Sequence, residues 1–238
     1  MRGANRHEKE YIVKTIVTTE TIKTIAERNG VEMYDVYTGF KWIANVMREN
    51  EGKKNYIGGG EESYGFLCED FVRDKDAVSA CVILAEIAAW AKDQGLSLYQ
   101  LLQKIYVEYG FSKEKGISVV KKGKSGAEEI EAMMKKFREN PLTEIAGSKV
   151  TYFYDYSTLK GKDYAENETV TLDMPTTSNV LQYFTEDNTK VSIRPSGTEP
   201  KIKFYMEVQG EMGCRNCYAS AESAAMEKIE AVKKSLGI

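Results

Sequence analysis

The stretch that decides how the second half of this chain folds is Arg194-Pro195-Ser196-Gly197-Thr198-Glu199-Pro200, followed by Lys201-Ile202-Lys203. Largely apolar and β-branched residues flank it at 190–193 and 202–208, and this composition predicts a strand on either side. The two prolines bracket the segment between the strands and stiffen it, while its glycine permits a close turn. The sequence therefore predicts a tight loop that joins two strands.

This loop combines groups that suit a phosphate dianion. The guanidinium of Arg194 offers a planar fork of donors, and Ser196 and Thr198 add rotatable hydroxyl donors. Gly197 has no Cβ, so an anion can approach its backbone N–H closely. An ordinary hairpin turn has a similar composition, and sulfate, carboxylate or a nucleic-acid phosphate would fit the same donors. The residues alone predict an anion site and leave the anion open.

A second glycine-rich stretch lies at Gly58-Gly59-Gly60-Glu61-Glu62-Ser63-Tyr64-Gly65. The carboxylate of Glu61 can accept hydrogens from two neighbouring hydroxyls, and Ser63 adds a donor or an acceptor. The glycines let the loop approach a ring closely. Taken by itself, the stretch is interpreted more readily as a turn whose acids face water.

Together the two stretches resemble the α-D-phosphohexomutases, the family of phosphoglucomutases and phosphomannomutases. Residues 194–201 resemble the phosphate-binding loop of the family's last domain, and residues 60–63 resemble the Gly-Glu-x-Ser sugar-binding loop of its third domain. The motifs occur in the family's order and near its spacing, and residues 73–77 open a long helix as in the phosphoglucomutase branch. The resemblance runs from about residue 11 to the last helix and implies the C-terminal half of a mutase.

The resemblance implies a role for each loop. Glu61 and Ser63 are expected to contact sugar hydroxyls, and Glu62 is expected to point elsewhere. The substrate phosphate that is not transferred is expected to bind the second loop. Its predicted ligands are Arg194, Ser196, Gly197, Thr198 and Lys203.

Two further lysines are candidates for sugar contacts. Lys14 lies in an otherwise apolar strand, where a buried charge needs a partner. Lys41 follows the Thr38-Gly39 turn at the start of a helix, where the helix dipole disfavours a cation. The resemblance implies a lysine near the substrate at comparable sites. An edge lysine whose ammonium reaches water is the alternative interpretation for both.

The family's catalytic parts are not found in this sequence. Members carry a phosphorylatable serine in a Thr/Ala-Ser-His-Asn-Pro loop and hold Mg²⁺ on an Asp-x-Asp-x-Asp-Arg loop. The single histidine, His7, lacks the first context, and no Asp-x-Asp-x-Asp occurs. We therefore predict no catalytic residue and no metal ligand in this chain, which alone is expected to be inactive. Mg²⁺ and the phosphoryl donor are expected from the missing N-terminal mutase domains.

The expected partners are hexose phosphates, namely glucose or mannose 1- or 6-phosphate, together with those missing domains. The α/β layer opens abruptly near residue 11, which favours a cut chain over the alternative of a natural, non-catalytic phosphosugar-binding module. A nucleic-acid-binding module is a third hypothesis. The formal net charge of −3 argues against it.

Composition also indicates in which cellular compartment the protein is expected. No apolar run approaches the length of a membrane span, and the charged first ten residues do not resemble a signal peptide. The chain is therefore expected to be cytoplasmic, with no membrane partner. Its four cysteines are expected to be reduced thiols, two of them in Cys214-Arg215-Asn216-Cys217. We interpret that pair as part of a connecting turn, in preference to a thioredoxin-like site or half of a zinc site.

Alternating strand and helix patterns up to residue 109 predict an α/β domain with a mostly parallel sheet. Ligands of such sheets bind beyond the carboxyl ends of the strands, where the turn at 38–41 and the loop at 59–63 both fall. The predicted strands are 11–18, 33–37 and 55–57, and the predicted helices are 20–28, 40–50, 75–94 and 97–109.

After Gly110 the pattern changes. It predicts a smaller α+β domain, with a largely antiparallel sheet and helices on one face. Its predicted strands are 117–120, 180–184, 191–193 and 203–208, and its predicted helices are 128–139 and 218–236. Residues 121–126 are predicted as a basic, flexible turn, and 152–175 as a mostly polar segment. The predicted domains are residues 1–112 and 113–238, the first of them truncated at its start.

Overall fold

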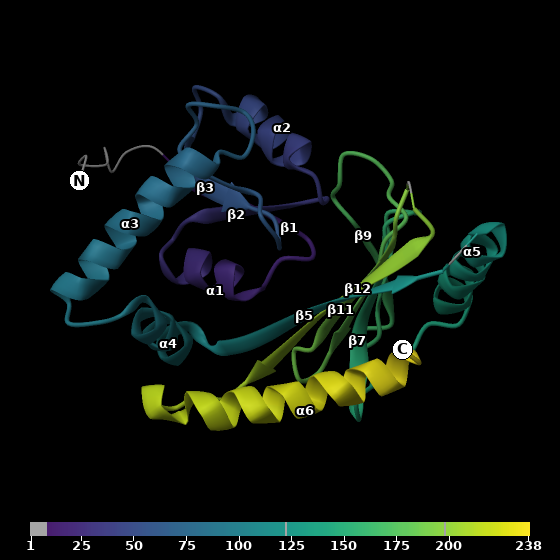
Figure 1. Ribbon diagram of the computed structural model, residues 1–238. Coiled ribbons are helices and arrows are strands. Elements are labelled where there is room, and N and C mark those ends of the chain that lie inside the picture. The colour runs from purple at the N-terminus through teal and green to yellow at the C-terminus, as the bar shows by residue number, and fades with distance from the viewer. Residues whose placement is uncertain (1–8, 122, 198) are drawn as a thin grey trace. The chain divides into compact units, whose positions relative to one another are not determined.

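The computed structural model of this chain describes residues 9–121, 123–197 and 199–238 (Figure 1). It contains two compact units, Met1–Gly110 and Phe111–Ile238. The predicted boundary after residue 112 falls inside the first strand of the second unit. The second unit is the larger of the two rather than the smaller.

The first unit alternates strands and helices as predicted. Its sheet has the order β2-β1-β3-β4, in which β1 is parallel to β2 and β3, and β4 is antiparallel to β3. A mostly parallel sheet with helices is confirmed. The elements are β1 (Glu10–Thr15), α1 (Thr21–Arg28), β2 (Glu32–Val36), α2 (Phe40–Asn50), β3 (Asn55–Gly60), β4 (Phe66–Cys68), α3 (Ala77–Asp93) and α4 (Leu98–Tyr109).

One face of α2 makes the core of the first unit. Its apolar residues recur every three or four positions, so they project to one side and pack on the sheet. The buried cluster comprises Tyr11, Val13, Val36, Phe40, Ile43, Val46, Met47, Tyr56 and Leu67. The carboxyl ends of β1, β2 and β3 share one edge of the sheet, and the segments after β2 and β3 carry the candidate site.

Asp76 caps the N-terminus of helix α3, because its carboxylate accepts hydrogen bonds from the backbone N–H groups of Val78 and Ser79. Many of its apolar side chains, including Val82 and Trp90, are exposed. In the part of the chain that the structure describes, neither this helix nor any other is long and apolar enough to cross a membrane.

The second unit is built on an antiparallel sheet with the order β5-β12-β11-β10-β7-β8-β9, and β6 pairs with β7. The α+β class is confirmed. The elements are β5 (Phe111–Val120), α5 (Gly123–Glu139), β6 (Glu144–Ile145), β7 (Ser148–Asp155), β8 (Lys160–Asp163), β9 (Glu168–Thr171), β10 (Leu181–Thr185), β11 (Lys190–Pro195), β12 (Lys201–Gly210), the 3₁₀ turn η1 (Arg215–Cys217) and α6 (Tyr218–Leu236).

Strand β12 organises the core of this unit. Alternate side chains along it, from Ile202 through Phe204 and Met206 to Val208, are buried. The Phe204 ring meets the ring of Phe137 from α5 edge-on, and α6 packs along β12 and β5. Helices α5 and α6 therefore bury the apolar side of the sheet, whereas Lys201, Lys203 and Tyr205 alternate to its other side.

The segment 152–175 differs from its prediction as a mostly polar stretch, because it contains the second half of β7 and all of β8 and β9. Positive φ angles of 54° at Leu159 and 56° at Asn167 mark the turns between these strands. Strand β9 is the edge of the sheet and β8 lies beside it, and both are rich in lysine, threonine and acids, so they lack the apolar alternation that identifies a strand in sequence.

The basic turn predicted at 121–126 is also wrong. Helix α5 begins at Gly123, well before the predicted start at residue 128. Glycine and serine in Lys121-Lys122-Gly123-Lys124-Ser125-Gly126 are typical of loops, and here the surrounding structure overrides that local preference.

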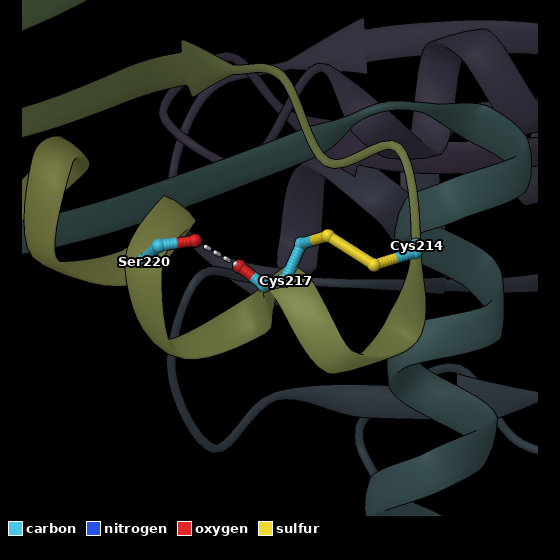
Figure 2. Close-up of a disulfide and its surroundings, with 3 residues drawn as sticks. All are labelled: Cys214, Cys217 and Ser220. Atoms are coloured by element: carbon cyan, nitrogen blue, oxygen red, sulfur yellow. Dashed lines mark hydrogen bonds between the residues drawn. A yellow bond between two sulfur atoms is a disulfide. The ribbon is translucent and has the colours of Figure 1, made fainter.

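The prediction that all four cysteines are reduced thiols is wrong for one pair. Cys214 and Cys217 form a disulfide, and Cys68 and Cys81 are free (Figure 2). The 3₁₀ turn between the pair brings their Cα atoms to 5.3 Å, a separation that a disulfide spans readily. The four-residue spacing did not by itself require this bond.

Truncating the core of the second unit should be costly. We expect Phe204→Ala, at a side chain with 0% exposure, to lower the free energy of unfolding by about 3–5 kcal/mol. The control Val120→Ala, at an exposed position on the neighbouring strand, should change it by less than about 0.5 kcal/mol. Urea unfolding measures the change in the free energy of unfolding for each variant, and hydrogen exchange of the β12 amides measures it independently. Equal losses in the two variants would contradict this assignment of the core.

Candidate functional site

An open pocket of about 510 Å³ surrounds the glycine-rich loop of the first unit. Apolar side chains from β1, α1 and β3 form its walls, among them Ile12, Ile22 and Ile57, while the polar groups come from the loop that follows β3. Both predicted sugar-binding loop residues, Glu61 and Ser63, line it. The pocket therefore presents a few polar groups against an apolar wall, as small-molecule sites commonly do.

The loop after β3 closes on itself. The N–H of Glu61 donates to the carbonyl of Gly65, and the N–H of Gly65 donates to the carbonyl of Ser63, both at 2.8 Å. Tyr64 turns the chain with a φ of 60°. A Cβ on Gly65 would lie 2.4 Å from Oε2 of Glu61, so only glycine leaves room for that carboxylate.

Glu61 ties the two loops at this edge of the sheet together. Its Oε1 accepts a 2.7 Å hydrogen bond from the backbone N–H of Gly39, in the turn that precedes α2. Lys41 lies in the first turn of that helix, exposed, with its Nζ 5.0 Å from the ring centroid of Trp42. The structure thus brings the segments of Glu61, Ser63 and Lys41 to one edge, and one carboxylate oxygen of Glu61 is already used as a brace.

Glu62 lines the same pocket, although it was expected to point elsewhere. The hydroxyl of Ser63 lies 3.4 Å from Oε1 of Glu62, a long hydrogen bond. Oε2 of Glu62 is buried and has no hydrogen-bond partner among the described residues. An unpartnered buried carboxylate oxygen is costly, and a hydroxyl entering the pocket would satisfy it. No pattern in the sequence distinguished Glu62 from Glu61 in this respect.

Lys14 is buried, with 1% of its side chain exposed, and the expected charge partners are present. Its Nζ lies 2.7 Å from Oδ1 of Asp35 on β2 and 3.0 Å from Oε1 of Glu20 at the start of α1. Burial alone would lower the pKa of this ammonium, but the two carboxylates outweigh burial and raise it. Lys14 therefore stays charged and holds β1 to its neighbours; it is not among the residues that line the pocket.

In the second unit, β11 ends at Pro195 and β12 begins at Lys201, so a short connection joins the two strands, as predicted. Several hydrogen bonds hold its described residues, among them Ser196 N–H to the carbonyl of Lys201 (2.8 Å), Glu199 N–H to Oγ of Ser196 (3.3 Å) and Lys121 N–H to the carbonyl of Pro200 (2.9 Å). The loop is thus anchored to β12 and to the end of β5. Thr198, a predicted phosphate ligand, lies outside the described residues.

Cationic groups flank this loop. Arg194 on β11 is directly opposite Lys203 on β12, so the two side chains share one face of the sheet. Neither forms an ion pair within residues 9–121, 123–197 and 199–238, and Nζ of Lys203 lies 5.7 Å from the ring centroid of Tyr205. Lys201, in contrast, pairs with Glu199 and lowers the pKa of that carboxyl group. Arg194 and Lys203 are therefore the charges available to an anion.

A second pocket, of about 580 Å³, adjoins the loop on its α5 side. Ser196 lines it together with side chains of α5, including Arg138. The guanidinium of Arg138 is already bonded to Asp155 at 3.0 Å and to Asn179 at 2.7 Å. This arginine joins α5 to the sheet, and its guanidinium is used in these two hydrogen bonds.

Within residues 9–121, 123–197 and 199–238, no group of three or more His, Cys, Asp and Glu side chains is arranged to hold a metal ion. The described residues therefore do not fit a Mg²⁺ site.

An α/β unit with a glycine-rich loop beyond β3, followed by an antiparallel unit with a cationic hairpin loop, defines a protein of the phosphohexomutase class. The family model described as phosphoglucomutase/phosphomannomutase, alpha/beta/alpha domain III, matches residues 1–109. The model described as phosphoglucomutase/phosphomannomutase, C-terminal domain, matches residues 118–213. The chain belongs to the phosphoglucomutase/phosphomannomutase family and carries its third and C-terminal domains.

Sequence comparison with individual proteins agrees with this family assignment. A phosphoglucomutase of Staphylococcus aureus is 39% identical over 198 residues, and one of Staphylococcus haemolyticus is 36% identical over 197; each alignment covers 83% of this chain. The aligned part is 36% of the length of each relative. The chain therefore spans little more than a third of the curated relatives it matches.

Solved structures show the same fold. The open form of pp63/parafusin, a phosphoglucomutase from Paramecium, superimposes with a TM-score of 0.57 at 18% identity, over 95% of this chain and 38% of that one. A putative phosphomannomutase from Thermus thermophilus gives a TM-score of 0.55 at 16% identity, over 94% and 37%.

The contact between Glu61 and Gly65 generates a prediction. In Gly65→Ala the new Cβ should displace the Glu61 carboxylate and break its hydrogen bond to the Gly39 N–H, at a cost of about 1.5–3 kcal/mol. The Gly39 amide should shift in an NMR spectrum. The matched control Gly116→Ala meets no atom within 4 Å and should leave that amide in place. An unchanged Gly39 amide in Gly65→Ala would show that Glu61 does not brace the loop.

Proposed function

We propose that this chain provides the substrate-recognition part of a phosphoglucomutase/phosphomannomutase, an intramolecular phosphotransferase that interconverts hexose 1-phosphate and hexose 6-phosphate. One observation carries the proposal. Arg194 and Lys203 face the same side of the sheet, beside the Ser-Gly loop, and no described carboxylate forms an ion pair with either, although Lys203 also lowers the pKa of Glu199 through its charge. Two uncompensated cations held together in this way favour a dianion.

The phosphate would bind through three kinds of donor. Arg194 would form a bidentate contact with two phosphate oxygens, and Lys203 would add a point charge. The backbone of Gly197 is open on its Cα side, since no described heavy atom other than those of its chain neighbours lies within 4 Å of where a Cβ would stand, and its N–H would be the third donor. Ser196 and Thr198 would complete the set with hydroxyl donors.

The sugar would bind at the loop after β3. The buried Oε2 of Glu62 needs a donor, and the hydroxyl of Ser63 is held only by a long contact to the same carboxylate. We therefore add Glu62 to the predicted sugar contacts Glu61 and Ser63, while Lys41 at the neighbouring turn remains a candidate. Lys14 would act by positioning β1, because its ammonium is already bonded to two carboxylates.

In this proposal the chain binds and orients, and other parts of the enzyme perform the transfer. A phosphoryl transfer that moves between C1 and C6 requires the sugar to bind in two orientations. Hydroxyl contacts that tolerate epimers, combined with one phosphate loop, permit both. The transferred group would come from a phosphoserine loop, and Mg²⁺ from a carboxylate loop, both supplied by residues outside this chain. The chain alone should therefore bind hexose phosphates without turnover.

A non-catalytic phosphosugar-binding module is the second candidate. It rests on the same two binding features, the cations opposite each other on β11 and β12 and the pocket at the loop after β3. Both candidates predict binding of hexose phosphates, so binding alone does not separate them. Complementation does: only the mutase part should restore turnover when the N-terminal two-thirds of a relative is added.

Calorimetric titration with glucose 6-phosphate tests the phosphate assignment. Arg194→Ala should weaken binding about tenfold to a hundredfold, the loss expected for charged hydrogen bonds. Arg215→Ala, an exposed arginine beyond the opposite end of β12, is the matched control and should bind as the parent chain does. Equal affinity of the parent and Arg194→Ala would refute the assignment.

A further inference from the structure

The Cys214–Cys217 disulfide has no part in the proposed sugar or phosphate contacts. It follows the last strand, β12, and opens the last helix, so the local order is strand, Cys-x-x-Cys, helix. Figure 2 shows the bond across the single turn of η1, with Cys217 at the start of α6. The sheet is antiparallel and no strand follows α6 among the described residues, so this is not a thioredoxin βαβ unit, but a Cys-x-x-Cys that opens a helix is a setting in which a thiolate is stabilised.

The two sulfurs differ in access. Cys214 is exposed, and so are its neighbours Gly213, Arg215 and Asn216. Cys217 is half-buried, and its N–H donates to the carbonyl of Cys214 at 3.0 Å, which holds the turn closed. An incoming thiolate therefore reaches the sulfur of Cys214 more readily than that of Cys217.

The two sulfurs also differ as leaving groups. Cys217 occupies the N-cap position of α6, a 19-residue helix, and within the described residues its side chain makes no capping hydrogen bond. The N-terminus of a helix stabilises negative charge, so a thiolate released there is favoured. Figure 2 shows that the hydroxyl of Ser220 donates a hydrogen bond of 2.8 Å to the carbonyl of Cys217. The side chain of Ser220 is therefore turned to this carbonyl, and the side chain at the N-cap position is that of Cys217 with its sulfur.

We propose that Cys214 and Cys217 are a reversible thiol–disulfide site that exchanges with a dithiol reductant of the thioredoxin class. A thiolate of the reductant attacks the sulfur of Cys214, a mixed disulfide forms, and the electron pair of the broken bond leaves on the sulfur of Cys217. The second thiol of the reductant then attacks its own sulfur in the mixed disulfide and releases Cys214. The reductant becomes a disulfide, its two protons pass to the two cysteines, and two electrons have moved.

The fold of the second unit should survive this exchange. The ring of Tyr218 packs edge-on against Phe111, and Glu222 pairs with Lys113 on β5, so α6 is docked independently of the disulfide. The pair also lies beyond one end of β12 and the phosphate loop at the other. Ten residues of extended strand separate them, roughly 30 Å. The exchange site is therefore independent of the proposed function, and each can fail without the other.

Trapping a mixed disulfide tests the proposal. The oxidised 238-residue chain, with Cys68→Ser and Cys81→Ser to remove the free thiols, is mixed under native conditions with a thioredoxin whose second active-site cysteine is replaced by serine. We expect a covalent adduct that peptide mass spectrometry maps to Cys214. Wild-type thioredoxin should raise the count of alkylatable thiols from none to two per chain. In the variants Cys214→Ser and Cys217→Ser, wild-type thioredoxin should not raise the count of alkylatable thiols by two.

Three results would overturn the proposal. The adduct could map to Cys217, which would reverse the assigned roles. The pair could resist reduction until the chain is denatured, which would make the disulfide purely structural. It could also stay reduced after exposure to oxidised glutathione. Glucose 6-phosphate affinity, measured on the oxidised and reduced chain alongside, should be the same within twofold.

Discussion

The buried ion pair between Lys190 and Glu207 fixes the register on which the candidate phosphate site depends. The two residues lie opposite each other on β11 and β12, each with 3% of its side chain exposed, and Nζ and Oε2 are 3.2 Å apart. A shift of one residue would leave these charges unpaired and turn Phe204 away from the core. The same register sets Arg194 opposite Lys203. Packing on one face and charge pairing on the other thus place the cations beside the loop.

A similar constraint operates in the first unit. The ammonium of Lys14 joins β1 to β2 and to the start of α1 through Asp35 and Glu20. Removal of either carboxylate would take away part of the stabilisation of a buried ammonium that water does not reach. At the edge of the same sheet, Glu61 connects the loop after β3 to the turn before α2. The sugar-binding candidates are therefore supported by strands whose own positions are fixed by buried polar contacts, which is how rigid binding sites are usually held.

Sequence predicted the features that local chemistry determines. Helices α2 and α6 have the predicted bounds because both show apolar spacing of three and four residues, and the Ser-Gly-Thr loop lies between two strands as its prolines indicated. Strands β8 and β9, at and next to the edge of the sheet, were missed because they carry few apolar residues. The Glu61 brace, the unpartnered oxygen of Glu62 and the disulfide arise from contacts through space, and neither periodicity nor spacing reveals which atoms meet.

An amide NMR titration of this chain with glucose 6-phosphate, and separately with inorganic phosphate, tests the central claim most directly. The account predicts that the amides of Ser196 and Gly197 shift with both ligands, because both carry the dianion. The amides of Glu61, Glu62 and Ser63 should shift only with the sugar phosphate. Silent loops with both ligands, or sugar-loop shifts that inorganic phosphate reproduces, would contradict the assignment of sugar and phosphate recognition to these two loops.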